Sequence, residues 1–473
     1  METKRSSFSG RIGFVLAAAG SAVGLGNIWR FPYLAAQYGG GIFLLVYILL
    51  SVTFGFSLMV AEIAIGRKTQ KSPIDAFRAL DKRFSFVGWL ATIVPIIILP
   101  YYSVIGGWVT KYFVGFITGS AGDMANPNFG GTDVSYFGDY ISSTESFFDL
   151  AEPMLWFFLF IGLTAVVVLL GVNKGVEKVS KFMMPALVVL IVFIVIYVLC
   201  TMDGALDGVV YYIKPDFSKF SVKTVVAAMG QLFYSMSLAM GIMITFGSYT
   251  KKDVSIEKST KQIELFDTGI AFLAGLMIIP AVYAFSNGDE AALASKGPGL
   301  MFEALPRVFE SMPLGWLIGA IFFIMVFFAA LTSARSLMET IVAVFMDKLK
   351  LGRKTSCFLV LGISLVLGAC SSLGYSAWGM VKILGLQFLD FFDFISNSFI
   401  MPIVALCTAI FVGFFLKPKT LVEEVELNGK FKFRVLFETV IKFVAPVCLV
   451  IILVSSVAGA LGINLGFLNF LIV

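Results

Sequence analysis

Long apolar runs separated by short polar segments repeat from residue 12 to residue 461. About 20 apolar residues in succession allow a helix to cross the roughly 30 Å hydrocarbon core of a bilayer. By this criterion the chain has about eleven membrane spans, at residues 12–36, 42–66, 86–118, 153–171, 178–200, 223–249, 261–286, 313–347, 356–374, 382–415 and 437–461. No extended polar domain separates them, so the pattern predicts one all-α transmembrane domain over residues 1–473.

Two polar segments have patterns of their own. Residues 68–80, "KTQKSPIDAFRAL", mix basic and apolar positions, which predicts an amphipathic helix along the inner membrane surface. Residues 286–313, "SNGDEAALASKGPGLMFEALPRVFESMP", predict an external loop with two short helical turns. This loop is long enough to act as a lid.

Two predicted spans are interrupted in comparable ways, the first at residues 20–27, "GSAVGLGN", and the sixth at residues 235–241, "SMSLAMG". Because five spans separate them, they occupy equivalent places in a five-plus-five inverted repeat, with repeats over about 12–200 and 223–415 and an extra helix at 437–461. Small residues that merely let helices pack closely are the alternative explanation for either break alone. Their equivalent positions favour a binding site.

Backbone that leaves helical geometry inside a bilayer exposes amide and carbonyl groups that must find partners. The N-terminal end of a half-helix suits a carboxylate, and the exposed carbonyls of a C-terminal end suit a cation. An amino acid zwitterion bound together with Na⁺ satisfies both. Gly24 and Gly26 let the backbone approach such a ligand, and Asn27 offers a hard amide oxygen.

Composition and charge support a membrane protein with a defined orientation. Hydrophobic residues make up 59% of the chain and charged residues 14%, with a mean hydropathy of +0.93. Basic clusters occur at the N-terminus and at 67–83, 174–181, 251–261 and 348–354, in every second loop. The positive-inside rule therefore predicts a cytoplasmic N-terminus in the cell (inner) membrane, and an odd number of spans predicts an extracellular C-terminus.

Several kinds of chemistry have no support in the sequence. The chain has no histidine, which excludes imidazole acid–base catalysis and histidine-ligated metals. Its five cysteines show no paired spacing, so no disulfide framework is implied. A thiol dyad and a nucleotide-binding glycine loop are also missing, so we expect a transporter and no enzyme.

The chain resembles the neurotransmitter:sodium symporter family, and in particular its bacterial amino-acid transporters. Its opening stretch "RIGFVLAAAGSAVGLGNIWRFPYLAAQYGGGIFLLVY" is similar to the family signature. Further matches follow in order as "VAEIAIGR", "PYY", a Gly-x9-Pro at Gly175–Pro185, "GQLFYSMSLAMG", "DTGIAFLAGLMIIP", "FFAALTSARSLMET" and "LDFFDF". The resemblance covers nearly the whole chain and implies the leucine-transporter-like fold, with helices 1 and 6 broken.

The resemblance implies two Na⁺ sites made of hard oxygens. The first would use the residues Ala22, Asn27, Ser235 and Asp267 together with the substrate carboxylate. The second would use the carbonyls and hydroxyls of Gly20, Val23, Ala329, Thr332 and Ser333. Taken alone, Thr332 and Ser333 hydroxyls more often bond back to their own helix.

The resemblance also implies a substrate pocket between the two breaks. It would be lined by Ser21, Ala22, Gly24, Leu25, Gly26, Ile98, Tyr102, Tyr234, Ser235, Ser237, Met240, Ser333 and Leu337. Relatives that carry biogenic amines have an aspartate where this chain has Gly24, so the substrate is expected to bring its own carboxylate. The mostly apolar lining favours a neutral, hydrophobic amino acid, although each apolar residue alone is more often core. Ala239 stands where many relatives have glycine, which implies a narrower pocket.

Two ion pairs are expected to act as gates: Arg30 with Asp393 on the outside and Arg5 with Asp347 on the inside. A charge such as Arg30 within a span is a functional candidate by default. Phe8 replaces a tryptophan that is common beside the inner pair. The Gly175–Pro185 motif could unwind the fifth span and admit water to the inner Na⁺ site.

Two further charged residues depart from the family pattern. Asp267 replaces the asparagine of animal relatives, whose chloride site is matched here by Tyr47, Gln231 and Ser235 but not by Ala271. We therefore expect transport that does not require chloride, with the Asp267 carboxylate in its place. Arg335 has two interpretations, an intrahelical ion pair with Glu339 or a position at the pocket edge that selects polar side chains.

The sequence thus predicts a Na⁺-coupled symporter that imports a neutral amino acid by alternating access. A substrate sensor with the transporter fold and a symporter for another small carboxylate-bearing solute remain alternatives. The expected partners are an amino acid and the lipid bilayer, with no nucleic acid. The sequence leaves a monomer and a homodimer both open.

Overall fold

The computed structural model describes residues 7–131, 133–289 and 299–461 as an almost entirely helical chain. Nine helical segments in these ranges are long and apolar enough to cross a membrane, and a bent pair adds a tenth. They are the bent Arg11–Ala22 with Gly26–Gln37, followed by Gly41–Thr69, Lys82–Thr118, Phe147–Leu169, Val172–Thr201, Ile256–Phe285, Gly315–Leu349, Arg353–Leu373, Phe388–Phe415 and Arg434–Gly459. Between the fifth and the next lie α12 (Val222–Ser235) and α13 (Ile242–Ser248), at the place of the expected sixth span.

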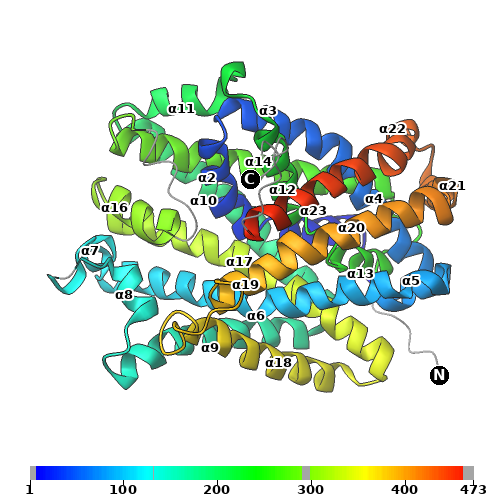
Figure 1. Ribbon diagram of the computed structural model, residues 1–473, viewed down its shortest axis with the longest axis horizontal. Coiled ribbons are helices and arrows are strands. Elements are labelled where there is room, and N and C mark those ends of the chain that lie inside the picture. The colour runs from blue at the N-terminus through cyan, green and yellow to red at the C-terminus, as the bar shows by residue number, and fades with distance from the viewer. Residues whose placement is uncertain (1–6, 132, 290–298, 462–473) are drawn as a thin grey trace.

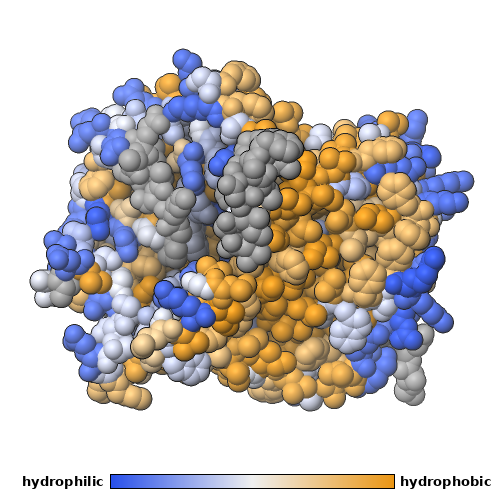
Figure 2. Space-filling model, viewed as in Figure 1, coloured by the Kyte–Doolittle hydropathy of each residue, from blue (hydrophilic) through white to orange (hydrophobic). Residues whose placement is uncertain are grey.

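Shorter helices gather at the two ends of the bundle (Figure 1). At one end lie α5 (Pro73–Leu80) and α21 (Pro418–Val425), and at the other α7 (Ala121–Ala125), α8 (Tyr136–Ser142) and α16 (Leu305–Glu310). Figure 2 shows hydrophobic side chains in a broad band between hydrophilic ends, as a bilayer requires. The α5 helix buries Ile74 and Phe77 on one face, which confirms the amphipathic helix predicted there.

Most predicted spans agree with the structure to within a few residues, and three begin elsewhere. The helix α9 (Phe147–Leu169) starts six residues before the predicted 153, because Ser146 and Asp149 form a capping box at its N-terminus. The fifth span starts with a wide turn, η5 (Val172–Glu177), that continues into α10 (Lys178–Thr201) without unwinding at Pro185. The tenth begins at α19 (Phe388–Asp393), later than the predicted 382.

The predicted external loop is described only in part. Residues 300–310 form the short turn η7 (Leu300–Ala304) and α16, which account for one helical stretch of the expected two. Residues 290–298 lie outside the described ranges, as do residues 462–473, on which the predicted position of the C-terminus depends.

The backbones of α4 (Phe56–Thr69) and α13 touch through two glycines. A Cβ atom built on Gly66 would lie 1.9 Å from the carbonyl oxygen of Ile244, and one built on Gly247 would lie 2.4 Å from that of Ile63. No residue with a side chain fits at either place without moving the backbone opposite. The second span and the second half of the sixth are therefore in direct backbone contact.

Candidate functional site

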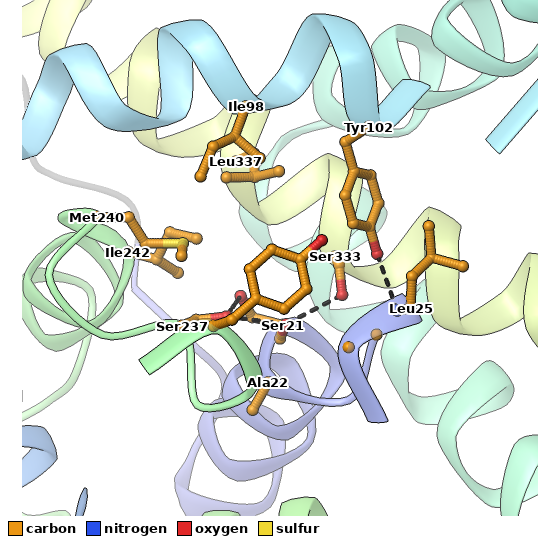
Figure 3. A pocket seen from close by; sticks show the side chains of 13 residues that line it. Ser21, Ala22, Leu25, Ile98, Tyr102, Ser237, Met240, Ile242, Ser333 and Leu337 are labelled. Carbon is orange, nitrogen blue, oxygen red and sulfur yellow. Dashed lines mark hydrogen bonds between the residues drawn. The ribbon is translucent and has the colours of Figure 1, made fainter. Parts of the chain in front are cut away.

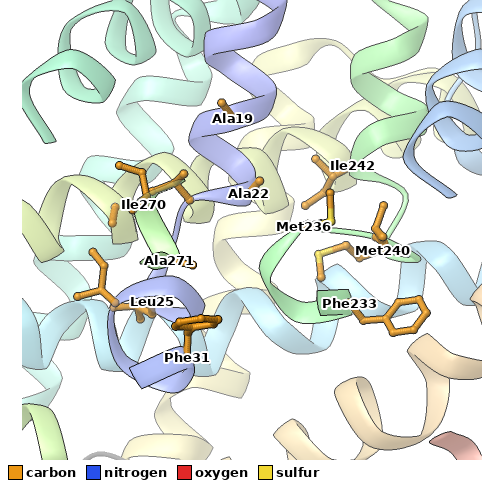
Figure 4. Packing of buried hydrophobic residues seen from close by; sticks show 14 of the residues in the cluster. Ala19, Ala22, Leu25, Phe31, Phe233, Met236, Met240, Ile242, Ile270 and Ala271 are labelled. Atoms are coloured by element: carbon orange, nitrogen blue, oxygen red, sulfur yellow. The ribbon is translucent and has the colours of Figure 1, made fainter. Parts of the chain in front are cut away.

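The first helix is interrupted where the sequence predicts it. The α1 helix (Arg11–Ala22) ends as Val23 turns extended, at φ −73° and ψ 103°, and the turn η1 (Gly26–Arg30) restarts the helix before α2 (Phe31–Gln37). The two parts make an angle of 51°. Figure 4 shows apolar side chains of this break, such as Leu25, beside Ile270 of α14 (Ile256–Phe285).

Side chains from other helices satisfy the backbone of this first break. The Leu25 N–H donates to the Tyr102 hydroxyl at 3.3 Å, and the Gln231 amide donates to the Gly26 carbonyl at 2.8 Å. The Gly24 N–H donates to Asn27 Oδ1 at 3.0 Å. These neutral partners replace the helical bonds that the break removes.

The second break, residues 236–241 between α12 and α13, has a different backbone. Ser237, Ala239 and Gly241 all have positive φ, at 53°, 61° and 71°. The Ala239 N–H donates to the buried Glu62 carboxylate at 2.7 Å, and the Ser237 hydroxyl donates to the Ser21 carbonyl at 2.9 Å. The second contact joins the two breaks directly.

A pocket lies between the two breaks and is closed on its other sides by α6 (Ser85–Thr118) and α17 (Gly315–Leu349) (Figure 3). The cavity itself is small, with a volume of about 30 Å³, so the lining side chains lie close together. Its lining consists of Ser21, Ala22, Gly24, Leu25, Gly26, Ile98, Tyr102, Tyr234, Ser237, Met240, Ile242, Ser333 and Leu337. None of these side chains is charged, so the pocket suits a ligand whose side chain is neutral and largely apolar.

The structure therefore brings twelve of the thirteen expected pocket residues around one cavity. Ser235, the thirteenth, does not line it, because its hydroxyl is bonded to Asn27 and Asp267 instead. Ile242 also lines the pocket, although the sequence did not predict it. It is the first residue of α13 and directly follows the second break, which brings it to the pocket. Ala239, expected to narrow the pocket, lies behind the lining, where its N–H meets Glu62.

Gly24 and Gly26 are where the chain comes closest to the pocket residues opposite. A Cβ atom on Gly24 would lie 2.6 Å from the Ser333 Oγ and 3.0 Å from the Tyr102 hydroxyl. One on Gly26 would lie 2.6 Å from Cδ1 of the Tyr234 ring. A side chain at either position would displace these neighbours, and the approach of the backbone to a ligand there stays a prediction.

Three residues of the first expected Na⁺ site form one buried cluster. The Asn27 amide donates to Ser235 Oγ at 2.9 Å and to Asp267 Oδ1 at 2.8 Å, and the Ser235 hydroxyl donates to the same Asp267 oxygen at 2.7 Å. The Tyr47 hydroxyl donates to Asp267 Oδ2 at 3.2 Å. Ala22, the fourth expected residue, is the last residue of α1 and lines the pocket beside this cluster. In this arrangement the Asn27 NH2 group faces the cluster while its Oδ1 accepts from Gly24, so the hard oxygens that an alkali cation prefers come here from Ser235 and the Asp267 carboxylate.

The residues of the second expected site also meet, between α1 and α17. The Ser333 hydroxyl donates to the carbonyls of Ser21 at 3.0 Å and Val23 at 3.3 Å. The Thr332 hydroxyl bonds the carbonyls of Phe328 and Ala329 in its own helix, the common arrangement for a helical threonine. Gly20 packs against this helix, with a built Cβ 3.4 Å from Thr332 Cβ.

Arg30 and Asp393 lie on one side of the pocket but form no ion pair in this structure. The Arg30 guanidinium lies over the Tyr234 ring, 5.3 Å from its centroid. Asp393 instead accepts from the Tyr101 hydroxyl at 3.1 Å and the Asn397 amide at 2.6 Å. Both charges thus have other partners, and a gating role for the pair stays a prediction.

On the opposite side, the chain before α1 is held to the fifth span. Ser9 donates to the Glu177 carboxylate through its N–H at 2.9 Å and through its hydroxyl, and Lys181 pairs with Glu177 at 2.6 Å. Phe8 packs edge-on against Phe246, in the place where the sequence departs from tryptophan. These contacts hold the segment before α1 against the fifth and sixth spans.

The expected inner pair is only half described. Arg5 lies outside the described ranges, whereas Asp347 accepts from the Ser72 N–H at 3.0 Å. The ion pair between them stays a prediction.

Neither interpretation of Arg335 is right. Glu339 pairs with Arg353 and accepts from the Tyr249 hydroxyl at 2.9 Å, so it forms no ion pair with Arg335. Arg335 points away from the pocket lining and toward the fifth span, where it donates to the Val176 carbonyl and, at 2.5 Å, to Ser180 Oγ. The partners lie on another helix, which the spacing along one helix could not indicate.

Glu62 belongs to the motif "VAEIAIGR", but the sequence predicted no role for it at the site. It is buried, holds the second break through Ala239, and its Oε2 has no hydrogen-bond partner among the described residues. A carboxylate inside a membrane span is a functional candidate by default. The position of Glu62 within the predicted second span could therefore have identified it from the sequence.

Comparisons with known proteins agree on the relationship of this chain. The family model described as "Sodium:neurotransmitter symporter family" matches residues 5–122 and 132–466. An uncharacterized sodium-dependent transporter of Bacillus subtilis is 34% identical over 461 residues, which cover 96% of this chain and 98% of the relative. The human sodium- and chloride-dependent creatine transporter 1 is 28% identical over 83% of this chain and 67% of its own length.

A solved structure is also similar. The crystal structure of MhsT in complex with L-phenylalanine superposes with a TM-score of 0.85 at 36% sequence identity, covering 96% of this chain and all of that one.

Proposed function

The chain belongs to the sodium:neurotransmitter symporter family, and from this premise we propose that it imports a neutral, hydrophobic amino acid together with Na⁺ by alternating access. The observation that carries the proposal is the uncharged pocket between two interrupted membrane helices. A similar chain was solved in complex with L-phenylalanine, whose uncharged, apolar side chain is of the kind that such a lining favours.

The substrate carboxylate would bind at the first break. There the Leu25 N–H and the Tyr102 hydroxyl lie 3.3 Å apart and face the pocket, and Gly24 carries no acid of its own, so the substrate would have to supply the carboxylate. Amide groups at the start of a half-helix stabilise an anion through their N–H groups and the helix dipole. The apolar part of the substrate would then contact Ile98, Met240 and Leu337.

The co-transported Na⁺ would bind at the cluster of Asn27, Ser235 and Asp267. Because Asn27 follows Leu25 by two residues, the ion and the substrate carboxylate would be neighbours of opposite charge. This contact couples the two bindings, since each ligand raises the affinity of the site for the other. The second expected site has a positively charged neighbour, Arg335, which changes what it can bind.

Chloride would not be required, because Asp267 supplies a fixed negative charge. Its carboxylate accepts from Tyr47 and Ser235, two residues that match the family's chloride site, while Ala271 offers no hydroxyl at the remaining position. In liposomes, uptake is expected to persist when gluconate replaces chloride. Strict dependence on chloride would contradict this part of the proposal.

The test of transport is uptake of labelled L-phenylalanine into liposomes that contain the purified protein. Accumulation above the external concentration with an inward Na⁺ gradient, and none with K⁺ in place of Na⁺, is the expected result. Binding without accumulation would support the alternative of a sensor. Inhibition by creatine but not by leucine or phenylalanine would support the alternative of another carboxylate-bearing solute, a class to which a relative's substrate belongs.

We also propose that the protein lies in the cell membrane with its N-terminus in the cytoplasm. The end of the bundle that holds α5 and the basic loops would then face inward, and the end with α7, α8 and α16 outward (Figure 1).

A further inference from the structure

Arg335 is a buried cation in the middle of α17. Its side chain has no solvent exposure, and its guanidinium donates to the Val176 carbonyl and to the Ser180 hydroxyl of the fifth span. Its Nε has no hydrogen-bond partner among the described residues. A guanidinium keeps its charge at neutral pH, so a positive charge is fixed inside the membrane domain here.

No carboxylate forms an ion pair with Arg335 in the described part of the chain. Glu339, one turn further along α17, pairs with Arg353. Glu177, next to Val176, pairs with Lys181. Each acid near Arg335 thus already has its own base, and the local sum remains one positive charge. Burying an unpaired charge inside a membrane domain costs free energy, so a charge in such a place is a functional candidate.

The charge lies next to the second expected Na⁺ site. Nη2 of Arg335 is 3.0 Å from the position of a Cβ on Gly20, and Thr332 Cβ is 3.4 Å from the same point. The carbonyl of Gly20 and the hydroxyl of Thr332 are two of the ligands expected for that ion. The guanidinium therefore lies beside Gly20, one of the residues that the ion would have to contact, on the side of the fifth span.

The two expected ion sites differ in charge for this reason. The cluster of Asn27, Ser235 and Asp267 contains a carboxylate and borders the pocket where the substrate carboxylate would bind. The second site offers only neutral oxygens and has Arg335 beside it. Because like charges repel strongly where water does not screen them, a second Na⁺ would bind far more weakly there than at the first site.

We propose that the Arg335 guanidinium takes the place of the second sodium ion, so that this chain transports one Na⁺ per substrate. The inference rests on the proposed function and revises the expectation of two ions. In this arrangement Arg335 does permanently what a bound ion would do reversibly: it places a positive charge between the first, fifth and eighth spans. The bonds to Val176 and Ser180 hold it there in the absence of any ion.

The test measures the Na⁺ to substrate ratio in liposomes with the membrane voltage clamped at zero by valinomycin and equal K⁺. A tenfold outward gradient of L-phenylalanine is set against a series of inward Na⁺ gradients, and the gradient at which net flux stops is recorded. One ion per substrate predicts a balance at about a tenfold Na⁺ gradient, and two ions predict a balance at about threefold. The wild-type protein alone decides the ratio, so a variant that fails to fold does not leave the proposal untested.

Two variants then assign the ratio to the charge of Arg335. Arg335→Met removes the charge and keeps an apolar chain, so the balance point is expected to move from tenfold toward threefold and the Hill coefficient for Na⁺ from 1 toward 2. Ser180→Ala removes one hydrogen bond of Arg335 and keeps its charge, so both values are expected to stay as in the wild type. If Ser180→Ala moved the ratio as far as Arg335→Met, packing and not charge would be responsible.

The outcomes separate the two proposals. A wild-type balance near threefold would overturn the role of Arg335 and leave Na⁺-coupled transport intact. Uptake that shows no dependence on Na⁺ at all would instead overturn the proposed function. An unchanged ratio in a folded, active Arg335→Met protein would overturn the assignment to Arg335.

Discussion

The two helix breaks look alike in sequence but are built differently. The first, around Gly24, has ordinary backbone angles and is held by neutral donors and acceptors such as Tyr102 and Gln231. The second has a serine and an alanine with positive φ and is held by the carboxylate of Glu62. The first break is therefore an opening that leaves backbone groups within reach of a ligand, whereas the second is a strained turn kept in place by its surroundings.

This difference assigns separate tasks to the two sides of the pocket. A non-glycine residue in the left-handed region costs about 1–2 kcal/mol, so Ser237 and Ala239 adopt it only because their neighbours enforce it. The first break stores no such strain and depends instead on the absence of side chains. Substitutions at the first break should therefore affect the ligand, and substitutions at the second should affect stability.

The largest effect is expected from adding one carbon to the first break. Gly26→Ala would place a Cβ 2.6 Å from the Tyr234 ring, and Gly24→Ala would place one 2.6 Å from Ser333 Oγ. To relieve so short a contact the pocket residues would have to move, and this displacement should lower uptake roughly a hundredfold or more. Uptake of labelled L-phenylalanine measures it.

A matched control is Gly162→Ala, because a Cβ on this membrane-span glycine meets nothing within 4 Å. It should transport as the wild type does. Normal uptake by Gly24→Ala and Gly26→Ala would show that the first break needs no close approach.

The next effect tests how the second break is held. Glu62→Ala removes the acceptor of the Ala239 N–H and should lower the free energy of unfolding by about 1–3 kcal/mol. Glu62→Gln keeps an oxygen acceptor in place and should lose less. Thermal unfolding of the purified protein in detergent compares the two, and equal losses would mean that the hydrogen bond to Ala239 contributes nothing.

A smaller effect is expected from Tyr102→Phe. The ring stays in place, but the hydroxyl 3.3 Å from the Leu25 N–H is lost, together with its proposed bond to the substrate carboxylate. The loss of one such bond, about 1–1.5 kcal/mol, should raise KM roughly tenfold. Unfolding without substrate should stay near the wild-type midpoint, whereas a large shift of that midpoint would point to a structural role instead.

The smallest effect is expected from Ala239→Gly. Glycine adopts a φ of 61° without strain, although it also adds freedom to the unfolded chain, so the net change should be a gain of less than about 1 kcal/mol. Because Ala239 lies behind the pocket lining, the ranking of substrates should not change. A new ability to transport tryptophan would show that Ala239 limits the pocket after all.

The pocket residues could be predicted only through the resemblance to a family, whereas the spans and the breaks depend on local patterns. The apolar runs, Gly24, Gly26 and the serine and methionine of the second break all carried that information. Contacts between distant helices could not be predicted in the same way. The spacing of Arg335 and Glu339 along α17 suggested an ion pair, but Arg353 and Ser180, which compete for these charges, are brought to them only by the fold.

For the same reason, the sequence could not show the hydrogen-bond partners of Ser235 or of the charged residues near Tyr234. The sequence places Ser235 both in the pocket and in the first Na⁺ site. In the structure its hydroxyl is directed toward Asp267, a direction that the sequence does not show. Arg30 and Asp393 have opposite charges, yet the Tyr234 ring and the Tyr101 hydroxyl are nearer partners in this structure.

The contact between Gly66 and Gly247 determines which parts of the bundle can move independently. At Gly66 and Gly247 the backbone of α4 lies directly against that of α13, with no side chain between them that could rearrange. The two segments are therefore expected to move together as one rigid unit. When the sixth span tilts, the second must travel with it in the same register. A joint of this unit is therefore expected at the break before α13, which borders the pocket, so that a ligand bound in the pocket would act directly on the hinge.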